Sequence, residues 1–316
     1  MEYLRITRDN IDAEHVCCAM SGKQALAKKE WLKRRFDEGL IFYRSVERGK
    51  CFIEYVPAEN AWVPIQADGY LYIDCLWVAG SMKGHGYSND LLRGCVRDAK
   101  EQGRKGLCIL SAEGRKREFL SDAKYLAHKG FMVADTSSCG IMLMSLPFGS
   151  DTEPPQFKEC AKYPTADGDG FVLYYTDQCP FTHYWVPRVE AVAEEHNIPL
   201  KTIHIISREQ AQNMPAPVTT YALFKDGEFL TQGIQSDKKF LKPAGVQVGC
   251  RPDVFLRCGG IMTFRTHYHS NKSDRPVRHG GNTPIRATVS VQCSEKHKEN
   301  GFRMNRNPYN VKPRNI

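Results

Sequence analysis

The sequence contains no apolar run approaching the ~20 residues that a membrane-spanning helix requires. Residues 1 to 15 are charged from the second position onward and lack the apolar core of a secretory signal. These two absences predict a cytoplasmic protein that does not insert into a membrane.

Cysteine pairs at redox or metal spacing are also missing. None of the 12 cysteines in this chain of 316 residues falls in a C-x-x-C pair, and several lie inside apolar runs. We therefore expect small buried hydrophobic residues rather than a disulfide framework. The cysteines and histidines from residue 250 onward do not have the spacing of a compact zinc site, so no metal is expected.

Most of the chain carries almost no net charge. The net charge is +8, yet residues 1–242 carry 31 basic and 32 acidic side chains, whereas residues 243–316 carry 13 and 4. This basic segment is rich in Gly, Pro, Asn, Ser and Thr, which predicts a disordered tail, or an extension without a selected function. Its aromatic residues are too scattered for a nucleic-acid stacking platform, so nucleic-acid binding is not favoured.

A strand, a glycine-rich turn and a helix follow one another in the first half. Residues 70 to 78 form an apolar run of strand length, and residues 80 to 86 are turn material. Gly84 and Gly86 lack a Cβ, so a ligand can approach the backbone there. The first amides of the following helix, at residues 87 to 89, have no intrahelical acceptor and favour an anion. Many such turns merely connect elements, so this spacing alone is a weak signal.

The pattern Val78-x-Gly80-x-x-Lys83-Gly84-x-Gly86-x-Ser88 resembles the acyl-CoA signature of the GNAT superfamily of N-acetyltransferases. Lys83 stands where Arg or Gln is usual, and Ser88 where Gly or Ala is usual. The triplet at residues 129 to 131, Lys-Gly-Phe, also fits the family. The resemblance covers residues 1 to 146 and implies an α/β (α+β) fold, a GNAT-type mixed sheet flanked by helices.

The resemblance implies acetyl-CoA as the acyl donor. Its pantetheine arm is expected along the backbone near residues 76 to 78, and its pyrophosphate on the turn that follows. The expected contacts are Leu76, Trp77, Val78, Lys83, Gly84, His85, Gly86, Tyr87 and Ser88.

Alternation along the strand predicts that Tyr72, Asp74 and Leu76 share one face. Asp74 is the preferred proton acceptor, with Tyr72 beside it; a hydrogen-bonded strand carboxylate without a catalytic role is the competing interpretation. Glu54 and Glu59 are alternatives that could equally bind the substrate.

The proton donor for the leaving thiolate stays unassigned. Many GNAT relatives place a tyrosine where this chain has Leu126, and Tyr125 is one residue away, a rotation of about 100° on a helix.

An early helix within residues 22 to 39 is expected to wall the acceptor site. Its predicted apolar residues are Leu26, Trp31, Leu32 and Phe36. The run Lys33-Arg34-Arg35 is interpreted as a solvated face.

The second half has a different pattern. A strand at residues 171 to 175, a helix opened by Cys179-Pro180-Phe181-Thr182, a strand at 201 to 206 and two further strands near 219 to 230 give a thioredoxin-like order. With the first half, this resembles GNAT proteins that carry a YoaP-like C-terminal domain, over residues 1 to 242.

Cys179 stands where a thioredoxin-like protein has its attacking thiol, and a helix start favours the thiolate. His183 is expected on the same helical face and could strengthen that effect. Thr182 occupies the resolving position, which excludes ordinary dithiol exchange. A monothiol reaction, a substrate-binding role and a structural cysteine remain open.

We therefore expect a GNAT domain at 1–146, a linker at 147–169, a YoaP-like domain at 170–242 and a tail at 243–316. The predicted function is acetyl-CoA-dependent transfer to a small-molecule amine. A monothiol redox protein whose GNAT domain senses acyl-CoA and a non-catalytic binding module are the alternatives. The sequence does not indicate an oligomeric state.

Overall fold

The computed structural model describes residues 1–16, 22–114 and 118–246, which belong to one compact unit, Met1–Val248. Within these residues no helix is both long and apolar enough to cross a bilayer. The tail predicted from residue 243 lies, beyond residue 246, outside the described residues.

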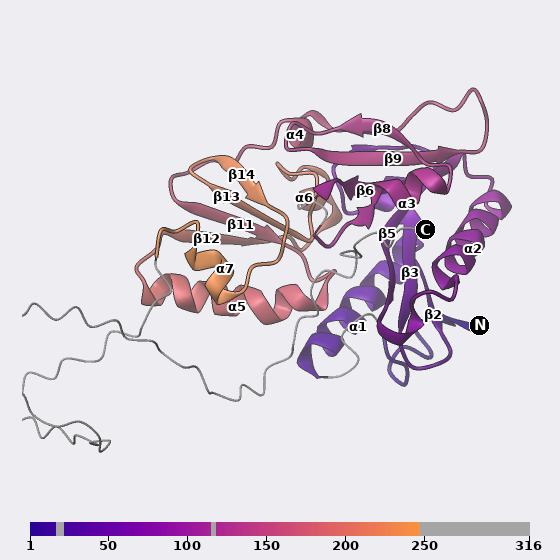
Figure 1. The fold of residues 1–316 in the computed structure, drawn as a ribbon, viewed down its shortest axis with the longest axis horizontal. Coiled ribbons are helices and arrows are strands. Elements are labelled where there is room, and N and C mark those ends of the chain that lie inside the picture. Colours follow the sequence, from indigo (N-terminus) through magenta and orange to yellow (C-terminus); the bar gives the residue numbers. More distant parts are fainter. Residues whose placement is uncertain (17–21, 115–117, 247–316) are drawn as a thin grey trace, which may run out of the picture. The chain divides into compact units, whose positions relative to one another are not determined.

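A large mixed sheet forms the first half of the unit (Figure 1). Its strand order is β1-β2-β3-β5-β6-β9-β8, and β7 pairs with β6. The strands are β1 (Tyr3–Ile6), β2 (Ile41–Ser45), β3 (Lys50–Pro57), β5 (Tyr70–Ala79), β6 (Gly106–Ala112), β7 (Ser121–Asp122), β8 (Met132–Thr136) and β9 (Ile141–Pro147). Neighbouring strands are antiparallel except for β5 with β6 and β6 with β7.

Helices cover both faces of this sheet. Helix α1 (Lys23–Arg35), which continues as the 3-10 turn η1 (Phe36–Glu38), packs Trp31 and Leu32 into the core of one face. Helices α2 (Tyr87–Glu101) and α3 (Ala123–His128) supply Leu92 and Leu126 to the core of the other face. The α/β fold class with a mixed, helix-flanked sheet is as predicted.

The buried face of α1 differs from the expectation. Leu26 is 62% exposed, whereas Lys28 and Arg35 are each 1% exposed. Residues 28, 31, 32 and 35 lie on one helical face, so both cations enter the core beside Trp31. The prediction that Arg35 belongs to a solvated run was wrong, because its guanidinium forms an ion pair with Glu38 and lies 5.0 Å from the centroid of the Trp62 ring.

A second sheet has the strand order β12-β11-β13-β14. Strand β11 (Phe171–Tyr175) pairs in parallel with β12 (Leu200–His204) and antiparallel with β13 (Tyr221–Lys225), which pairs antiparallel with β14 (Glu228–Thr231). The helices of this half are α5 (Pro180–Glu195), α6 (Arg208–Gln212) and α7 (Asp237–Leu241). The predicted capping box at the start of α6 forms, with Gln210 N donating to Ser207 Oγ at 3.2 Å.

The two sheets share one apolar core. Val172 and Phe224 of the second sheet belong to the same cluster as Trp31 and Trp62. On the far face of that sheet, the Phe171 ring lies 5.0 Å from Phe240 of α7. The intervening segment is ordered: β10 (Gln156–Phe157) pairs with β4 (Ile65–Gln66), and α4 (Glu159–Lys162) follows.

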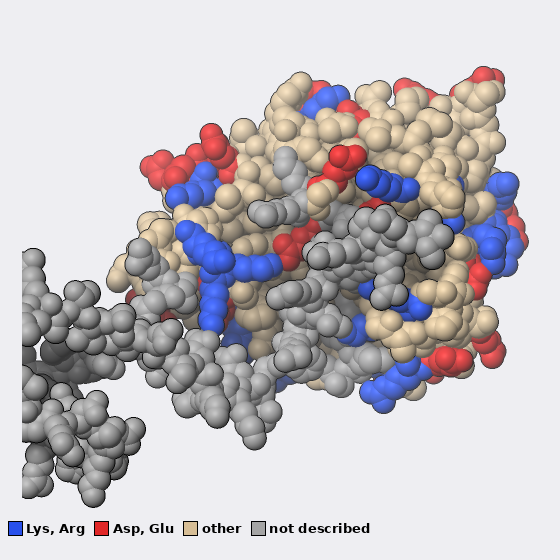
Figure 2. All heavy atoms as spheres, in the orientation of Figure 1, with Lys and Arg blue, Asp and Glu red and all other residues tan. Residues whose placement is uncertain are grey.

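On the face that Figure 2 shows, charged side chains of both signs are interspersed among the described residues. This mixture agrees with the balance of 31 basic and 32 acidic residues in residues 1–242. Among the described cysteines, Cys51, Cys95 and Cys108 are buried, as expected for small hydrophobic side chains.

Candidate functional site

The turn after β5 exposes backbone to a ligand. The chain passes through the 3-10 turn η3 (Gly80–Met82) and reaches α2 by way of Gly84 and Gly86, whose φ angles are +83° and +79°. Side chains rarely adopt this left-handed conformation, which glycine tolerates. A Cβ built on either glycine would meet nothing within 4 Å, so both face open space.

The amides of this turn form an anion-binding arrangement. Asn89 N and Asp90 N donate to Gly86 O, at 2.9 and 3.3 Å. Among the described residues, the amides of residues 84 to 88 have no hydrogen-bond acceptor. Unpaired N–H groups at the positive end of a helix dipole favour an anion such as a pyrophosphate. The side chains of Lys83 and His85 are exposed on the same turn.

β5 separates from its neighbour before it reaches the turn. Its parallel pairing with β6 runs only from Tyr70 opposite Gly106 to Ile73 opposite Ile109. Farther along, β6 pairs with β7 at residues 111 and 112 instead. Between Asp74 and the end of β5, the pairing described is with β3 alone. This splayed edge includes Leu76, Trp77 and Val78, beside which an extended ligand arm was predicted.

Asp74 occupies a β-bulge. In the pairing of β3 with β5, Tyr55 lies opposite Ile73 and Glu54 opposite Cys75, so Asp74 is the extra residue. Beyond the bulge, each side chain of β5 points to the face opposite to the one that simple alternation along the strand predicts. Leu76 packs in the core on the α2 face, whereas Tyr72 packs on the α1 face. The prediction that Leu76 shares a face with Tyr72 was therefore wrong, because an inserted residue reverses the alternation beyond it.

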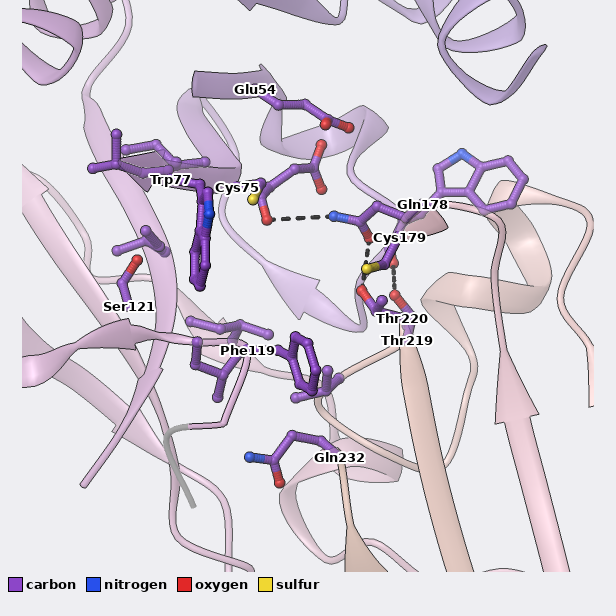
Figure 3. Close-up of a pocket in the computed structure, with 18 of the residues that line it drawn as sticks. Glu54, Cys75, Trp77, Phe119, Ser121, Gln178, Cys179, Thr219, Thr220 and Gln232 are labelled. Carbon is purple, nitrogen blue, oxygen red and sulfur yellow. Dashed lines mark hydrogen bonds between the residues drawn. The ribbon is translucent and has the colours of Figure 1, made fainter. Parts of the chain in front are cut away.

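A cavity of about 110 Å³ lies between the end of β5 and the second sheet (Figure 3). Tyr72, Asp74, Leu76 and Trp77 line it, whereas Val78 and the turn at 83–88 do not. Its other lining residues are Lys28, Glu54, Trp62, Ile73, Cys75, Ile109, Leu110, Phe119, Leu120, Ser121, Gln178, Cys179, Phe181, Val218, Thr219, Thr220, Gln232 and Ile234.

Two carboxylates and one lysine set the electrostatics of the cavity. Lys28 Nζ lies 2.6 Å from Glu54 Oε2, and both side chains are 1% exposed. Burial, and to a smaller extent the nearby Glu54, raise the pKa of Asp74 to about 7, while Arg35 and Lys28 oppose the shift. A carboxyl group with this pKa can exchange a proton near neutral pH.

Tyr72, predicted to lie beside the base, and Glu59, an alternative base, have surroundings that differ from those of Asp74. Burial also raises the pKa of Tyr72 well above its ordinary value, so its phenol stays protonated. Glu59, an alternative base, forms an ion pair with Arg104 at 2.6 Å and does not line the cavity.

Gln178 connects the two halves at the bulge. Its Nε2 donates to the carbonyl oxygen of Asp74 at 3.3 Å, and its Oε1 accepts from Thr220 Oγ1 at 3.0 Å (Figure 3). Thr219 makes a parallel link, with Oγ1 donating to Trp62 O at 2.6 Å. The loops that follow β11 and precede β13 thereby contact both the wall of the cavity and the backbone of the residue predicted as the base.

Cys179 lines the cavity as the N-cap residue of α5. Thr182, at the resolving position, is buried and donates its hydroxyl to Thr176 O at 2.8 Å and Cys179 O at 2.7 Å. His183 is exposed and does not line the cavity, so the structure does not bring it to the site with Cys179.

Sequence reasoning missed Lys28, Gln178 and the two threonines. For Lys28 a signal existed, because a lysine three and four residues before Trp31 and Leu32 lies within their apolar stripe. For Gln178 no local signal exists, because its partners are 104 and 42 residues away in the chain.

Tyr125 lies next to the start of α2. Leu126 is fully buried, whereas the Tyr125 hydroxyl lies buried beside the Ser88 side chain at the start of α2. Burial raises the pKa of Tyr125, and Ser88 opposes the shift. Its phenol therefore holds its proton next to the anion-binding turn.

Comparisons with known proteins agree with this arrangement. Residues 199–242 match the YoaP-like family. The chain is 42% identical over 246 residues to an uncharacterised N-acetyltransferase YoaP of Bacillus subtilis (strain 168), which covers 77% of this chain and 98% of that protein.

Solved acetyltransferases show a distant likeness. A GNAT family acetyltransferase of Brucella melitensis, crystallised with acetyl-CoA, has 15% identity and a TM-score of 0.32 over 50% of this chain and 92% of its own. PaiA N-acetyltransferase of Thermoplasma acidophilum, crystallised with coenzyme A, has 13% identity and a TM-score of 0.32 over 47% and 100%. The YoaP match, which spans nearly the whole of that relative, decides the assignment: this chain belongs to the YoaP family of N-acetyltransferases.

Proposed function

We propose that the protein transfers an acetyl group from acetyl-CoA directly to a small-molecule amine. One observation carries this proposal. The stretch from residue 74 to residue 88 has a carboxylate with a near-neutral pKa at one end, a splayed strand edge in the middle and a turn of unpaired amides at the other end. These are the three parts that an acceptor, a pantetheine arm and a pyrophosphate need.

The amides of residues 84 to 88 would hold the pyrophosphate, with Lys83 adding positive charge. The backbone of Leu76 to Val78 would pair with the pantetheine arm as if it were a strand. This placement directs the thioester toward the cavity that Asp74 and Trp77 line.

Within the cavity, Asp74 would take a proton from the acceptor ammonium, and the neutral nitrogen would attack the thioester carbonyl carbon. As the C–N bond forms, a backbone N–H of β5 would stabilise the oxyanion. When the C–S bond breaks, the attacking nitrogen would lose its second proton as it becomes an amide, and that proton would pass to the departing thiolate. No acyl-enzyme forms, so Cys179 is not required as a nucleophile.

The test is release of free coenzyme A thiol from acetyl-CoA in the presence of a panel of amines, amino acids and peptides. Calorimetry with coenzyme A measures donor binding separately. Amine-dependent release together with donor binding is the expected result. A well-folded protein that fails to bind coenzyme A would overturn the proposal, and one that binds it without releasing thiol would be a non-catalytic binding module.

The alternative is a monothiol redox protein with an acyl-CoA-sensing first domain. The position of Cys179 at the start of a 16-residue helix supports it, as does the β12-β11-β13-β14 order of residues 170–242, which we interpret as thioredoxin-like. Rapid thiol labelling of Cys179 that glutathione blocks would favour this alternative.

A further inference from the structure

One carboxylate oxygen of the buried Glu54 has no hydrogen-bond partner among the described residues. Glu54 is 0% exposed, and its Oε2 is bound by Lys28 at 2.6 Å. Its Oε1 is buried and has no hydrogen-bond partner among the described residues. A buried charged acceptor without a donor is costly, and Glu54 lines the cavity, so a donor group on a ligand would complete its hydrogen bonding (Figure 3).

The positive charge that lines the cavity, on Lys28, already forms an ion pair with Glu54. Among the lining residues that the structure describes, Lys28 carries the one permanent cationic side chain, and it is bound to Glu54. Asp74 adds a second acidic group. A ligand that brought its own carboxylate or phosphate into this space would lack a free cation and would face two acidic side chains.

The remaining wall is largely apolar. Trp77, Phe119 and Phe181 contribute aromatic surface, and Ile109 and Ile234 contribute aliphatic surface. A volume of about 110 Å³ admits a small ligand rather than a peptide chain. The walls therefore suit a compact apolar body attached to a single cationic group.

From this arrangement we infer that the cavity selects small amines that carry no acidic group, with Glu54 Oε1 accepting a hydrogen bond from the ammonium and Lys28 binding the other carboxylate oxygen of Glu54. This inference rests on the proposed acetyl transfer and names its acceptor class. The two carboxylates divide the work: Glu54 binds the cation, and Asp74 receives the proton.

The first experiment compares amines with the amino acids from which they differ by one carboxylate, namely phenethylamine with phenylalanine and 3-methylbutylamine with leucine. We expect kcat/KM for thiol release to be about 100-fold higher or more for each amine, because a buried unpaired carboxylate costs at least that much. Equal or higher values for the amino acids would overturn the inference.

Direct binding keeps this result separate from the fate of the proposed function. Calorimetry measures phenethylamine and phenylalanine with the full chain, with and without coenzyme A. If coenzyme A binds but neither amine does, the inference fails while the donor site stands. If phenethylamine binds and coenzyme A does not, acetyl transfer fails while the cation site stands.

Variants then identify the recognition groups. The Glu54→Gln and Lys28→Met pair removes both charges together, because a single change would strand the other charge in the core. We expect this double variant to stay folded and to bind coenzyme A, but to raise KM for phenethylamine by about tenfold or more, as loss of a charged hydrogen bond predicts. An unchanged KM would overturn the role of Glu54.

A gain of function provides an independent check. Phe119 is 38% exposed at the cavity, so Phe119→Arg can be accommodated without disturbing the core. The added cation should raise kcat/KM for phenylalanine relative to phenethylamine by about tenfold, whereas the neutral control Phe119→Gln should not. The same response to both variants would count against charge as the selecting factor.

Discussion

The anion-binding turn and the acceptor cavity are built in opposite ways, although only a few residues of β5 separate them. The turn presents backbone amides at exposed positions held by Gly84 and Gly86. The cavity presents buried side chains contributed by α1, β3, β5 and the second sheet. Donor recognition is therefore local in sequence, whereas acceptor recognition depends on the assembly of the whole unit.

The difference predicts that variants at the two ends will separate donor binding from turnover. Changes at the turn should weaken coenzyme A binding, and changes in the cavity should slow transfer while leaving that binding intact. The four variants that follow test this separation.

Gly86→Trp should have the largest effect. Residue 86 has a φ of +79° and faces open space, so an indole would be strained and would fill the place of the pyrophosphate. Loss of several amide bonds to a charged ligand predicts at least about 100-fold weaker coenzyme A binding by calorimetry. Gly94→Ala, in the middle of α2 with open space around it, is the matched control and should bind normally.

Asp74→Asn should lower kcat by about 100-fold, the contribution usual for a general base, with little change in coenzyme A binding. Thiol release measured against pH checks the assignment. Because the pKa of Asp74 is raised to about 7, wild-type kcat/KM should increase as pH rises through 7, and the variant should lose this increase. An unchanged rate across pH would exclude Asp74 as the base.

The same variant should also be more stable above pH 7. Burial raises the Asp74 pKa above its ordinary 3.8, so the folded state binds this proton more tightly than the unfolded state. Its contribution to stability is present below about pH 4 and is lost as pH rises through about 7. A neutral asparagine avoids that loss, which thermal unfolding of both proteins at pH 4 and pH 8 would show.

Gln178→Glu should lower activity at pH 7 by a smaller factor than Asp74→Asn does. The new carboxylate would lie next to Asp74 and raise the Asp74 pKa, because like charges favour the protonated form. Activity at pH 7 should fall about three- to tenfold and recover at higher pH. Gln178→Leu removes the same hydrogen bonds without charge and should show no such recovery.

Cys179→Ser should have the smallest effect. In the acetyl-transfer mechanism this residue only lines the cavity, so kcat should change less than about threefold. A loss as large as that of Asp74→Asn would instead support the monothiol alternative.

The locally encoded parts of the fold were predictable. Residues 70 to 88 contain their own strand, turn and helix signals, and Ser207 with Gln210 contains its own cap. The bulge at Asp74 was not predictable, because it depends on the register with β3. Lys28 was missed although its spacing from Trp31 and Leu32 places it in their apolar stripe; its ion-pair partner Glu54, which is 26 residues away, could not be read from that spacing.

The splayed end of β5 has a consequence for the protein before it meets its ligand. A strand without a neighbour along one side, such as β5 beyond Ile73, is a template for pairing with other chains, and sheets normally protect such edges. If the bound donor covers this edge, it prevents the edge from pairing with other chains, in addition to supplying the acetyl group. Donor binding would then also raise the free energy of unfolding, by mass action on the folded state.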